Sequence, residues 1–118
     1  MKIEIKLVKP VETYVRAINA RDADAFLTGF APDAVVKDNG REIRGTAAIK
    51  EWSEREIFAV NVTLDVMDVV ERDGQMIVTV KIDGTFPRDG LPNPLVMDHI
   101  FRIADEKIAE LTCRLVEK

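Results

Sequence analysis

Residues 35–52, VVKDNGREIRGTAAIKEW, carry the pattern of a strand, a tight turn, a second strand and the start of a helix. The Asn-Gly pair at 39–40 is typical of a two-residue hairpin turn, because both positions tolerate a left-handed backbone. It predicts a hairpin made of strands 34–38 and 41–44. Thr46 is then expected to cap the helix that follows.

Asp38 ends the first strand of this hairpin and is the best candidate for a working acid or base. Alternation along the strand places it on the same side as Val36, so if Val36 faces the core, the carboxylate lies in apolar surroundings. A carboxylate there is costly unless it is paired or has a function. The alternative is a plain turn residue, since Asp is common before Asn-Gly for hairpin chemistry alone.

Two amphipathic helices are expected before the hairpin. The first begins at Pro10, which suits a first helical turn. Its apolar stripe consists of Val11, Tyr14, Val15 and Ile18. The second is capped by Asp22 and ends at residues 31–33. Its inward side chains are Ala25, Phe26, Leu27 and Phe30. The helix after the hairpin buries Ile49, Trp52, Ile57 and Phe58, and alternation over residues 2–9 favours a short strand.

Alternating segments after Asn61 predict four strands. They are expected over residues 62–72, 75–84, 95–104 and 107–116. A phase shift at 67–68 predicts a bulge that bends the first of them. The segment 85–94 holds three of the five prolines and is therefore expected to be a loop. Together the elements predict an α+β fold: a curved, cone-shaped antiparallel sheet with three N-terminal helices on its concave face and a pocket between them.

Length and composition limit the possible functions. The 118 residues are expected to form one domain, 1–118. A net charge of −4 without basic runs argues against nucleic acid and anionic membranes as partners. The N-terminal segment lacks the apolar run of a signal peptide, so a cytoplasmic location is expected. A single cysteine, Cys113, excludes an internal disulfide, and with one histidine it cannot form a structural zinc site.

Three stretches resemble the nuclear-transport-factor-two-like superfamily, specifically its SnoaL-like and ketosteroid isomerase branch. They are TYVRAINARDADAFLTGFAPDAVVKD (13–38), GTAAIKEW (45–52) and IFRIADEKIAEL (100–111). The resemblance implies a cystatin-like, ketosteroid isomerase-like cone. It also implies an isomerase, dehydratase or cyclase that acts on a small apolar carbonyl compound by acid/base chemistry, without a metal or an organic cofactor.

The resemblance assigns roles to individual residues. Tyr14 in TYVRAIN stands at the position of the oxyanion-hole tyrosine, and Asp38 in VVKD at the position of the general base. The family's third site residue, a protonated aspartic acid, lies in the penultimate strand, where VMDHIFRI offers both Asp98 and His99. Phe30 and Ser53 stand where the isomerases have supporting tyrosines.

Strand periodicity separates Asp98 from His99, because a shift of one residue exchanges the two faces of a strand. The more apolar face consists of Leu95, Met97, His99, Phe101 and Ile103. It is expected on the concave side, so His99 is the preferred candidate for the pocket unless a bulge near Asp98 resets the phase. An imidazole there is expected to make any activity depend on pH near neutrality.

The remaining expectations concern the pocket wall and the partners. Pocket-lining residues are expected to be Val15, Ile18, Phe26, Phe30, Val36, Trp52, Phe58, Val80, Phe86, Met97, Phe101 and Cys113. Two other functions remain open, a module that binds a small apolar ligand without turnover and a dimerisation domain. A homodimer is expected through the outer sheet face, because helices cover only the other face. That outer face is expected to present Val96, Ile100, Ile108, Thr112 and Val116.

Overall fold

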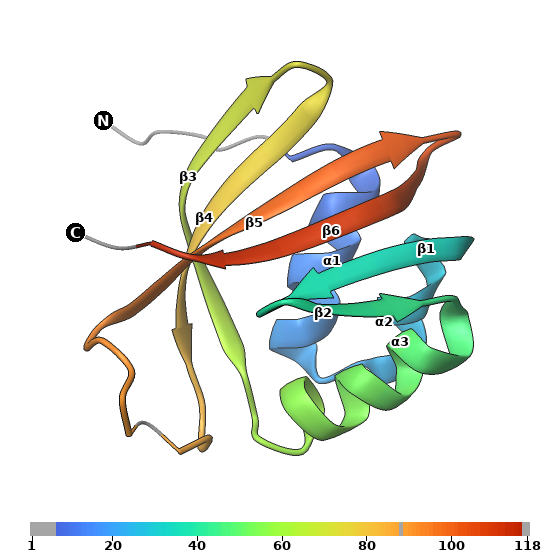
Figure 1. Ribbon diagram of the computed structural model, residues 1–118. Coiled ribbons are helices and arrows are strands. Elements are labelled where there is room, and N and C mark those ends of the chain that lie inside the picture. Colours follow the sequence, from blue (N-terminus) through green and yellow to red (C-terminus); the bar gives the residue numbers. More distant parts are fainter. Residues whose placement is uncertain (1–6, 88, 117–118) are drawn as a thin grey trace.

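The computed structural model describes residues 7–87 and 89–116. The elements follow the expected order: α1 (Lys9–Ala20), α2 (Ala23–Thr28), β1 (Phe30–Asp38), β2 (Arg41–Arg44), α3 (Thr46–Ser53), a π-helical turn η1 (Glu54–Phe58), β3 (Thr63–Arg72), β4 (Gln75–Asp83), β5 (Leu95–Ala104) and β6 (Lys107–Leu115) (Figure 1). Of the strand expected over residues 2–9, residues 2–6 lie outside the described residues, and Lys9 begins α1.

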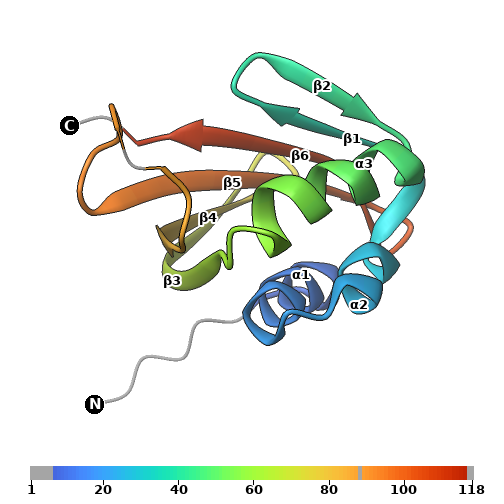
Figure 2. The ribbon, with the colours of Figure 1, turned by 90° about the horizontal axis from the view of Figure 1, so that it is seen from below.

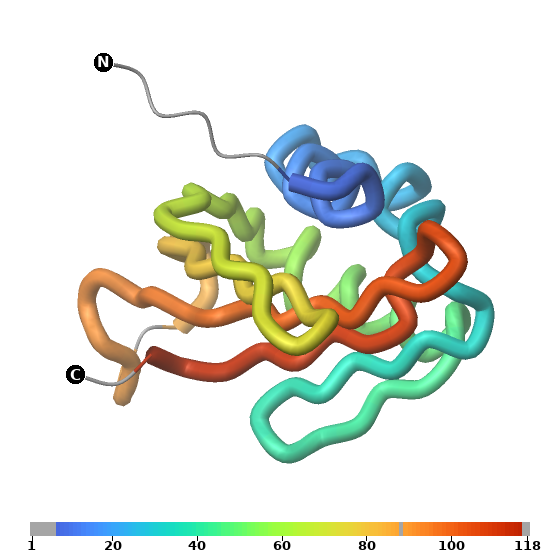
Figure 3. The backbone as a smooth tube through the Cα atoms, turned by 90° about the horizontal axis from the view of Figure 1, so that it is seen from above, coloured from blue at the N-terminus to red at the C-terminus, as the bar shows by residue number. Residues whose placement is uncertain are grey.

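One six-stranded sheet runs through the molecule in the order β2-β1-β6-β5-β4-β3. The last four strands form the expected antiparallel meander, and β1 joins it by parallel pairing with β6. The sheet is curved, and the helices lie on one side of it (Figures 2 and 3). The predicted fold class, a curved sheet with three helices, is therefore confirmed. No helix within the described ranges is long and apolar enough to cross a lipid bilayer.

The start of β1 was predicted wrongly. The strand begins at Phe30, so residues 31–33 belong to it instead of ending α2, which stops at Thr28. Its pairing with β6 is irregular between Phe30 and Val35, and its pairing with β2 starts only at Val35. Pro32 is tolerated there because its missing N–H is not needed in an interrupted ladder.

The expected cap of α3 was also wrong. The N-cap position is Gly45, with φ 84°, and no side chain caps the helix. The Thr46 hydroxyl instead donates to the carbonyl of Pro32 at 3.3 Å, which ties the helix start to β1. The other predicted cap is confirmed, because the Asp22 carboxylate accepts from the Ala25 N–H at 3.1 Å.

Besides the irregular start of β1, the described strands contain two bulges, and one of them was not predicted. The expected bulge lies between Val66 and Asp68 in β3. The second lies in β6: Arg102 pairs with Glu110 and Ile103 with Ile108, which leaves Ala109 as an extra residue. This residue exchanges the faces of the strand start, so Ile108 is fully buried and not on the outer face, where it was expected.

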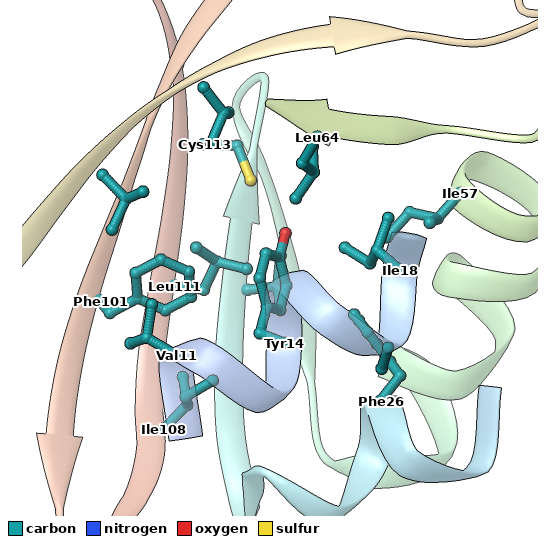
Figure 4. Packing of buried hydrophobic residues seen from close by; sticks show 14 of the residues in the cluster. Val11, Tyr14, Ile18, Phe26, Ile57, Leu64, Phe101, Ile108, Leu111 and Cys113 are labelled. Carbon is teal, nitrogen blue, oxygen red and sulfur yellow. The ribbon is translucent and has the colours of Figure 1, made fainter. Parts of the chain in front are cut away.

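The core fills the space between the helices and the sheet. The buried face of β4 is the expected one, Met76, Val78, Val80 and Ile82. From α1, Val11 and Tyr14 point into the core beside Phe101 and Leu111, and Ile18 lies beside Ile57 (Figure 4). The Asn19 side chain at the end of α1 joins the helix to β3: its amide donates to the Leu64 carbonyl at 2.9 Å, and its oxygen accepts from the Leu64 N–H at 2.7 Å.

Candidate functional site

A cavity of about 400 Å³ lies between α1, the end of α3, the β1–β2 turn and the loop before β5. Five of the predicted lining residues do line it: Ile18, Trp52, Phe86, Met97 and Cys113. The site candidates Tyr14, Asp38 and His99 line it as well. Three side chains separated widely in sequence are thus brought to one cavity by α1, β1 and β5.

The other predicted lining residues pack in the core and do not line the cavity. They are Val15, Phe26, Phe30, Val36, Phe58, Val80 and Phe101. Ring contacts explain the position of three of them: Tyr14 lies 5.4 Å from Phe26, 6.2 Å from Phe30 and 5.0 Å from Phe101, measured between ring centroids. These rings fill the closed end of the cone, and only the Tyr14 hydroxyl reaches beyond them. In Figure 4 it points towards the space between Cys113 and Leu64.

Tyr14 and His99 form the polar pair at the depth of the cavity. The Tyr14 hydroxyl and His99 Nδ1 share a hydrogen bond of 3.1 Å, and both residues are buried. Burial raises the pKa of Tyr14 well above its ordinary value, and Cys113 and Asp38 raise it further. Burial also lowers the pKa of His99 to about 4, against a smaller opposite effect of Asp98. The pair is therefore neutral at pH 7.

The low pKa corrects one expectation. His99 was expected to make activity depend on pH near neutrality, but its pKa of about 4 keeps the folded protein's imidazole uncharged there. The physical reason is the loss of hydration, which disfavours the imidazolium inside an apolar pocket.

Asp98 lies on the opposite face of β5 from His99. Its carboxylate accepts from the Thr79 hydroxyl at 2.7 Å and lies 3.6 Å from the guanidinium of Arg114. Asp98 therefore does not reach the cavity, and parity along the strand separates the two candidates because β5 has no bulge before Arg102.

Asp38 stands at the centre of a charged network at the cavity wall. Its Oδ2 accepts from Arg41 Nη2 at 3.0 Å and from Trp52 Nε1 at 3.2 Å. Arg41 also contacts Glu56 through both Nη atoms, at 2.8 and 2.9 Å. Asp38 Oδ1 accepts no hydrogen bond from the part of the chain that the structure describes. Oδ2 is thus anchored, and Oδ1 has no hydrogen-bond donor among the described residues.

Sequence reasoning missed Arg41 and Glu56. The first was accessible from the hairpin register, since Arg41 pairs with Asp38 directly across the turn. No pattern in the sequence indicated Glu56, because the direction of its side chain depends on the π-helical turn η1. In this turn the Ala59 N–H donates to the Glu54 carbonyl, five residues earlier.

Cys113 lies between the two halves of the site. It pairs with Asp38 on one side and with His99 on the other, so the three side chains form a row across β1, β6 and β5. Burial, and to a lesser extent Asp38, raises the pKa of its thiol far above its ordinary range. The thiol stays protonated, which disfavours a role as a nucleophile and makes Cys113 a small apolar part of the wall. Residues 7–87 and 89–116 contain no cluster of His, Cys, Asp and Glu suited to a metal ion.

The site combines two polar groups in a mainly apolar cavity. They are the Asp38 carboxylate, whose Oδ1 accepts no hydrogen bond from the described residues, and the buried Tyr14 hydroxyl. A carboxylate of this kind can take up a proton, and a buried hydroxyl can stabilise an oxyanion that forms during the reaction.

Comparisons with known proteins identify the family of this chain. The family model described as SnoaL-like domain matches residues 11–111. A Sinorhizobium meliloti protein, provisionally named a polyketide cyclase, is 30% identical, with a TM-score of 0.82 over 92% of this chain and 95% of that one. None of the curated proteins is significantly similar in sequence.

Two further solved structures share the fold at lower identity. The Δ5-3-ketosteroid isomerase of a Mycobacterium species is 18% identical, with a TM-score of 0.70 over 88% of each chain. Rv0760c of Mycobacterium tuberculosis, crystallised with estradiol-17β-hemisuccinate, is 14% identical, with a TM-score of 0.74 over 88% of each chain. The chain therefore belongs to the SnoaL-like family, and it shares its fold with a ketosteroid isomerase.

Proposed function

We propose that this protein is an acid/base enzyme, an isomerase, dehydratase or cyclase, that acts on a small, mostly apolar carbonyl compound. The observation that carries the proposal is that the Asp38 carboxylate and the Tyr14 hydroxyl line the same apolar cavity of about 400 Å³. Such a volume suits a small organic ligand, and two polar groups in an apolar wall can orient it.

In the proposed reaction Asp38 Oδ1 removes a proton from a carbon next to the substrate carbonyl. The electron pair of that C–H bond moves towards the carbonyl oxygen, which becomes an enolate. Tyr14 donates a hydrogen bond to this oxygen, and Asp38 then returns the proton to carbon. Trp52 and Arg41 keep Oδ2 fixed during both transfers, which limits the motion of the base.

The proposed role of His99 is to orient Tyr14. With a pKa of about 4 it is a neutral imidazole at pH 7. In the tautomer that carries the proton on Nδ1, it donates to the Tyr14 oxygen and leaves the hydroxyl hydrogen for the substrate. The names of the relatives support the substrate class, since one is called a polyketide cyclase and another is a ketosteroid isomerase.

Exchange of carbon-bound hydrogen tests the proposal directly. The protein is incubated in D₂O with a panel of one- to three-ring β,γ-unsaturated ketones, and proton NMR follows deuterium uptake and conjugation. Catalysed exchange by the natural sequence, lost in Asp38→Asn and reduced less in Tyr14→Phe, is the expected result. Exchange that survives Asp38→Asn would refute Asp38 as the base.

A second candidate function is binding of a small apolar ligand without turnover. It is favoured by the hydrogen bonds that Asp38 already accepts from Arg41 and Trp52, which stabilise the carboxylate in the absence of substrate. Native mass spectrometry of the purified protein separates the two candidates when combined with the exchange assay. A co-purified compound that binds but exchanges no hydrogen supports the binding module.

We also propose that the protein forms a homodimer through the outer sheet face. Helices cover only the opposite face (Figure 2). The outward side chains Val96, Ile100 and Thr112 are half-buried in the monomer and mix apolar with polar character, as homodimer contacts do.

A further inference from the structure

Arg41 binds its two carboxylate partners in different ways. Towards Glu56 the guanidinium presents both Nη atoms, with Nη1–Oε2 at 2.9 Å and Nη2–Oε1 at 2.8 Å. Towards Asp38 it offers only one side-chain bond, Nη2–Oδ2 at 3.0 Å. Its Nε donates at 3.4 Å to the backbone carbonyl of Asp38 and not to the carboxylate.

This division matters because a two-point guanidinium–carboxylate pair is the strong form of the interaction. A cation that binds a carboxylate at two points lowers its proton affinity more than one that binds it at a single point. Both hydrogens of Arg41 Nη2 are already used, one by Glu56 and one by Asp38. Glu56 thus holds the edge formed by Nη1 and Nη2, while Asp38 contacts the edge formed by Nε and Nη2 through its backbone carbonyl and one carboxylate oxygen.

We propose that Glu56 is a positioning residue that acts through Arg41: by holding the guanidinium at two points, it restricts Arg41 to one hydrogen bond with Asp38 and so preserves the basicity of that carboxylate. The inference rests on the proposed function, in which Asp38 is the base. It adds that the basicity of Asp38 depends on how the hydrogen bonds of Arg41 are shared between Asp38 and Glu56.

The other titratable groups near Asp38 that the structure describes do not supply a charge that could replace that of Arg41. Asp38 affects the pKa values of Tyr14 and Cys113, and both groups are neutral at pH 7 because burial raises those values. His99 is neutral as well, with a pKa of about 4. Arg55 acts on Glu56 and helps to lower its pKa, after the larger effect of the Arg41 hydrogen bond. Within residues 7–87 and 89–116, Arg41 is therefore the cation that contacts Asp38, and its side chain is half-exposed, at 50%.

The test is the titration of the Asp38 carboxyl carbon by ¹³C NMR in the natural protein without any substrate. Arg41→Gln should raise the titration midpoint, because it removes a cation within hydrogen-bond distance of the carboxylate. Glu56→Gln should lower the midpoint, because Arg41 then turns more fully to Asp38. A role in folding alone would not move the midpoint in opposite directions.

Two comparisons show whether Glu56 acts through Arg41. Glu51→Gln removes the same charge from α3, where Glu51 lies 3.6 Å from Arg55 and is 70% exposed, and it should leave the midpoint unchanged. In the double variant Arg41→Gln/Glu56→Gln, the effect of the Glu56 change should largely disappear. An equal Glu56→Gln effect with and without Arg41 would overturn the proposal, as would a midpoint that rises or stays unchanged in the single variant.

If Arg41→Gln does not fold, Arg41→Lys takes its place, because lysine keeps the positive charge but cannot hold Glu56 at two points; an equal Glu56→Gln effect in that background would overturn the proposal. This test can also fail independently of the proposed function. Correct midpoint shifts without hydrogen exchange on any ketone would contradict the enzyme and leave the coupling intact. Exchange that depends on Asp38 without these shifts would contradict the coupling and leave the enzyme intact.

Discussion

Lowering the pH from 7 to 5 should destabilise this protein mainly through His99. The imidazole is buried and its pKa is lowered to about 4, whereas in the unfolded chain it has an ordinary pKa of about 6.5. The unfolded state therefore binds a proton first as the pH falls. The associated stability is present above about pH 6.5 and is lost as the pH falls towards 4.

The size of the effect follows from the two pKa values. At pH 7, protonation of His99 in the unfolded chain contributes little free energy. At pH 5, His99 is mostly protonated in the unfolded chain but still neutral in the folded protein. Linkage between these states predicts a loss of about 2 kcal/mol in the free energy of unfolding over this interval. The interval ends above the pH at which the Arg41-paired Glu56 becomes protonated, because its pKa is lowered from 4.5.

Urea unfolding at both pH values measures the loss, with the fluorescence of the buried Trp52, the single tryptophan, as the signal. His99→Gln is the matched control, because an amide can still bond to the Tyr14 hydroxyl but does not titrate. The natural sequence should lose about 2 kcal/mol more than this variant. Equal losses would show that His99 is not a buried neutral imidazole.

Three other expectations concern stability and assembly. Tyr14→Phe should lower the free energy of unfolding by about 1–2 kcal/mol in urea titrations, since its ring packing is kept but the buried Nδ1 of His99 loses its partner; no change would mean that water replaces the hydroxyl. Gly84→Ala should lower the melting temperature by roughly 5–10 °C in calorimetry, because its Cβ would lie 2.7 Å from the Val60 carbonyl oxygen; an unchanged value would show that this backbone yields easily. Sedimentation at micromolar concentration should give a dimer that Ile100→Glu converts to a monomer, and a monomeric natural protein would refute the outer-face interface.

Periodicity predicted much of the architecture and of the site for one physical reason, which is that side-chain direction in a strand depends on parity. His99 faces inward and Asp98 outward because β5 is regular between Leu95 and Arg102. The same rule failed in β6, where Ile108 faces the core. There the apolar spacing changes from three residues, Ile108 to Leu111, to two residues, Leu111 to Cys113, and this change marks the bulge.

Periodicity does not predict how deep in the cone a side chain lies. Periodicity assigns Phe26 and Phe30 to the inner side, but it does not say that these rings pack against Tyr14 at the closed end and not at the cavity. Glu56 was missed for a related reason. It is fifteen residues from Arg41 in sequence, and their contact depends on the wide helical turn that follows α3.

The bond pattern of Asn19 has a consequence for solubility. β3 is an edge strand, and edge strands expose N–H and C=O groups that can recruit another chain and begin a polymer. The Asn19 side-chain amide hydrogen-bonds to both the N–H and the C=O of Leu64, as the backbone of a neighbouring strand would. It therefore satisfies the edge of β3 at this one residue. Beyond that point the strand is bent by its bulge and bears Asp65, Asp68 and Glu71. A single amide from α1, a bend and three negative charges thus protect the β3 edge of the sheet against pairing with another chain.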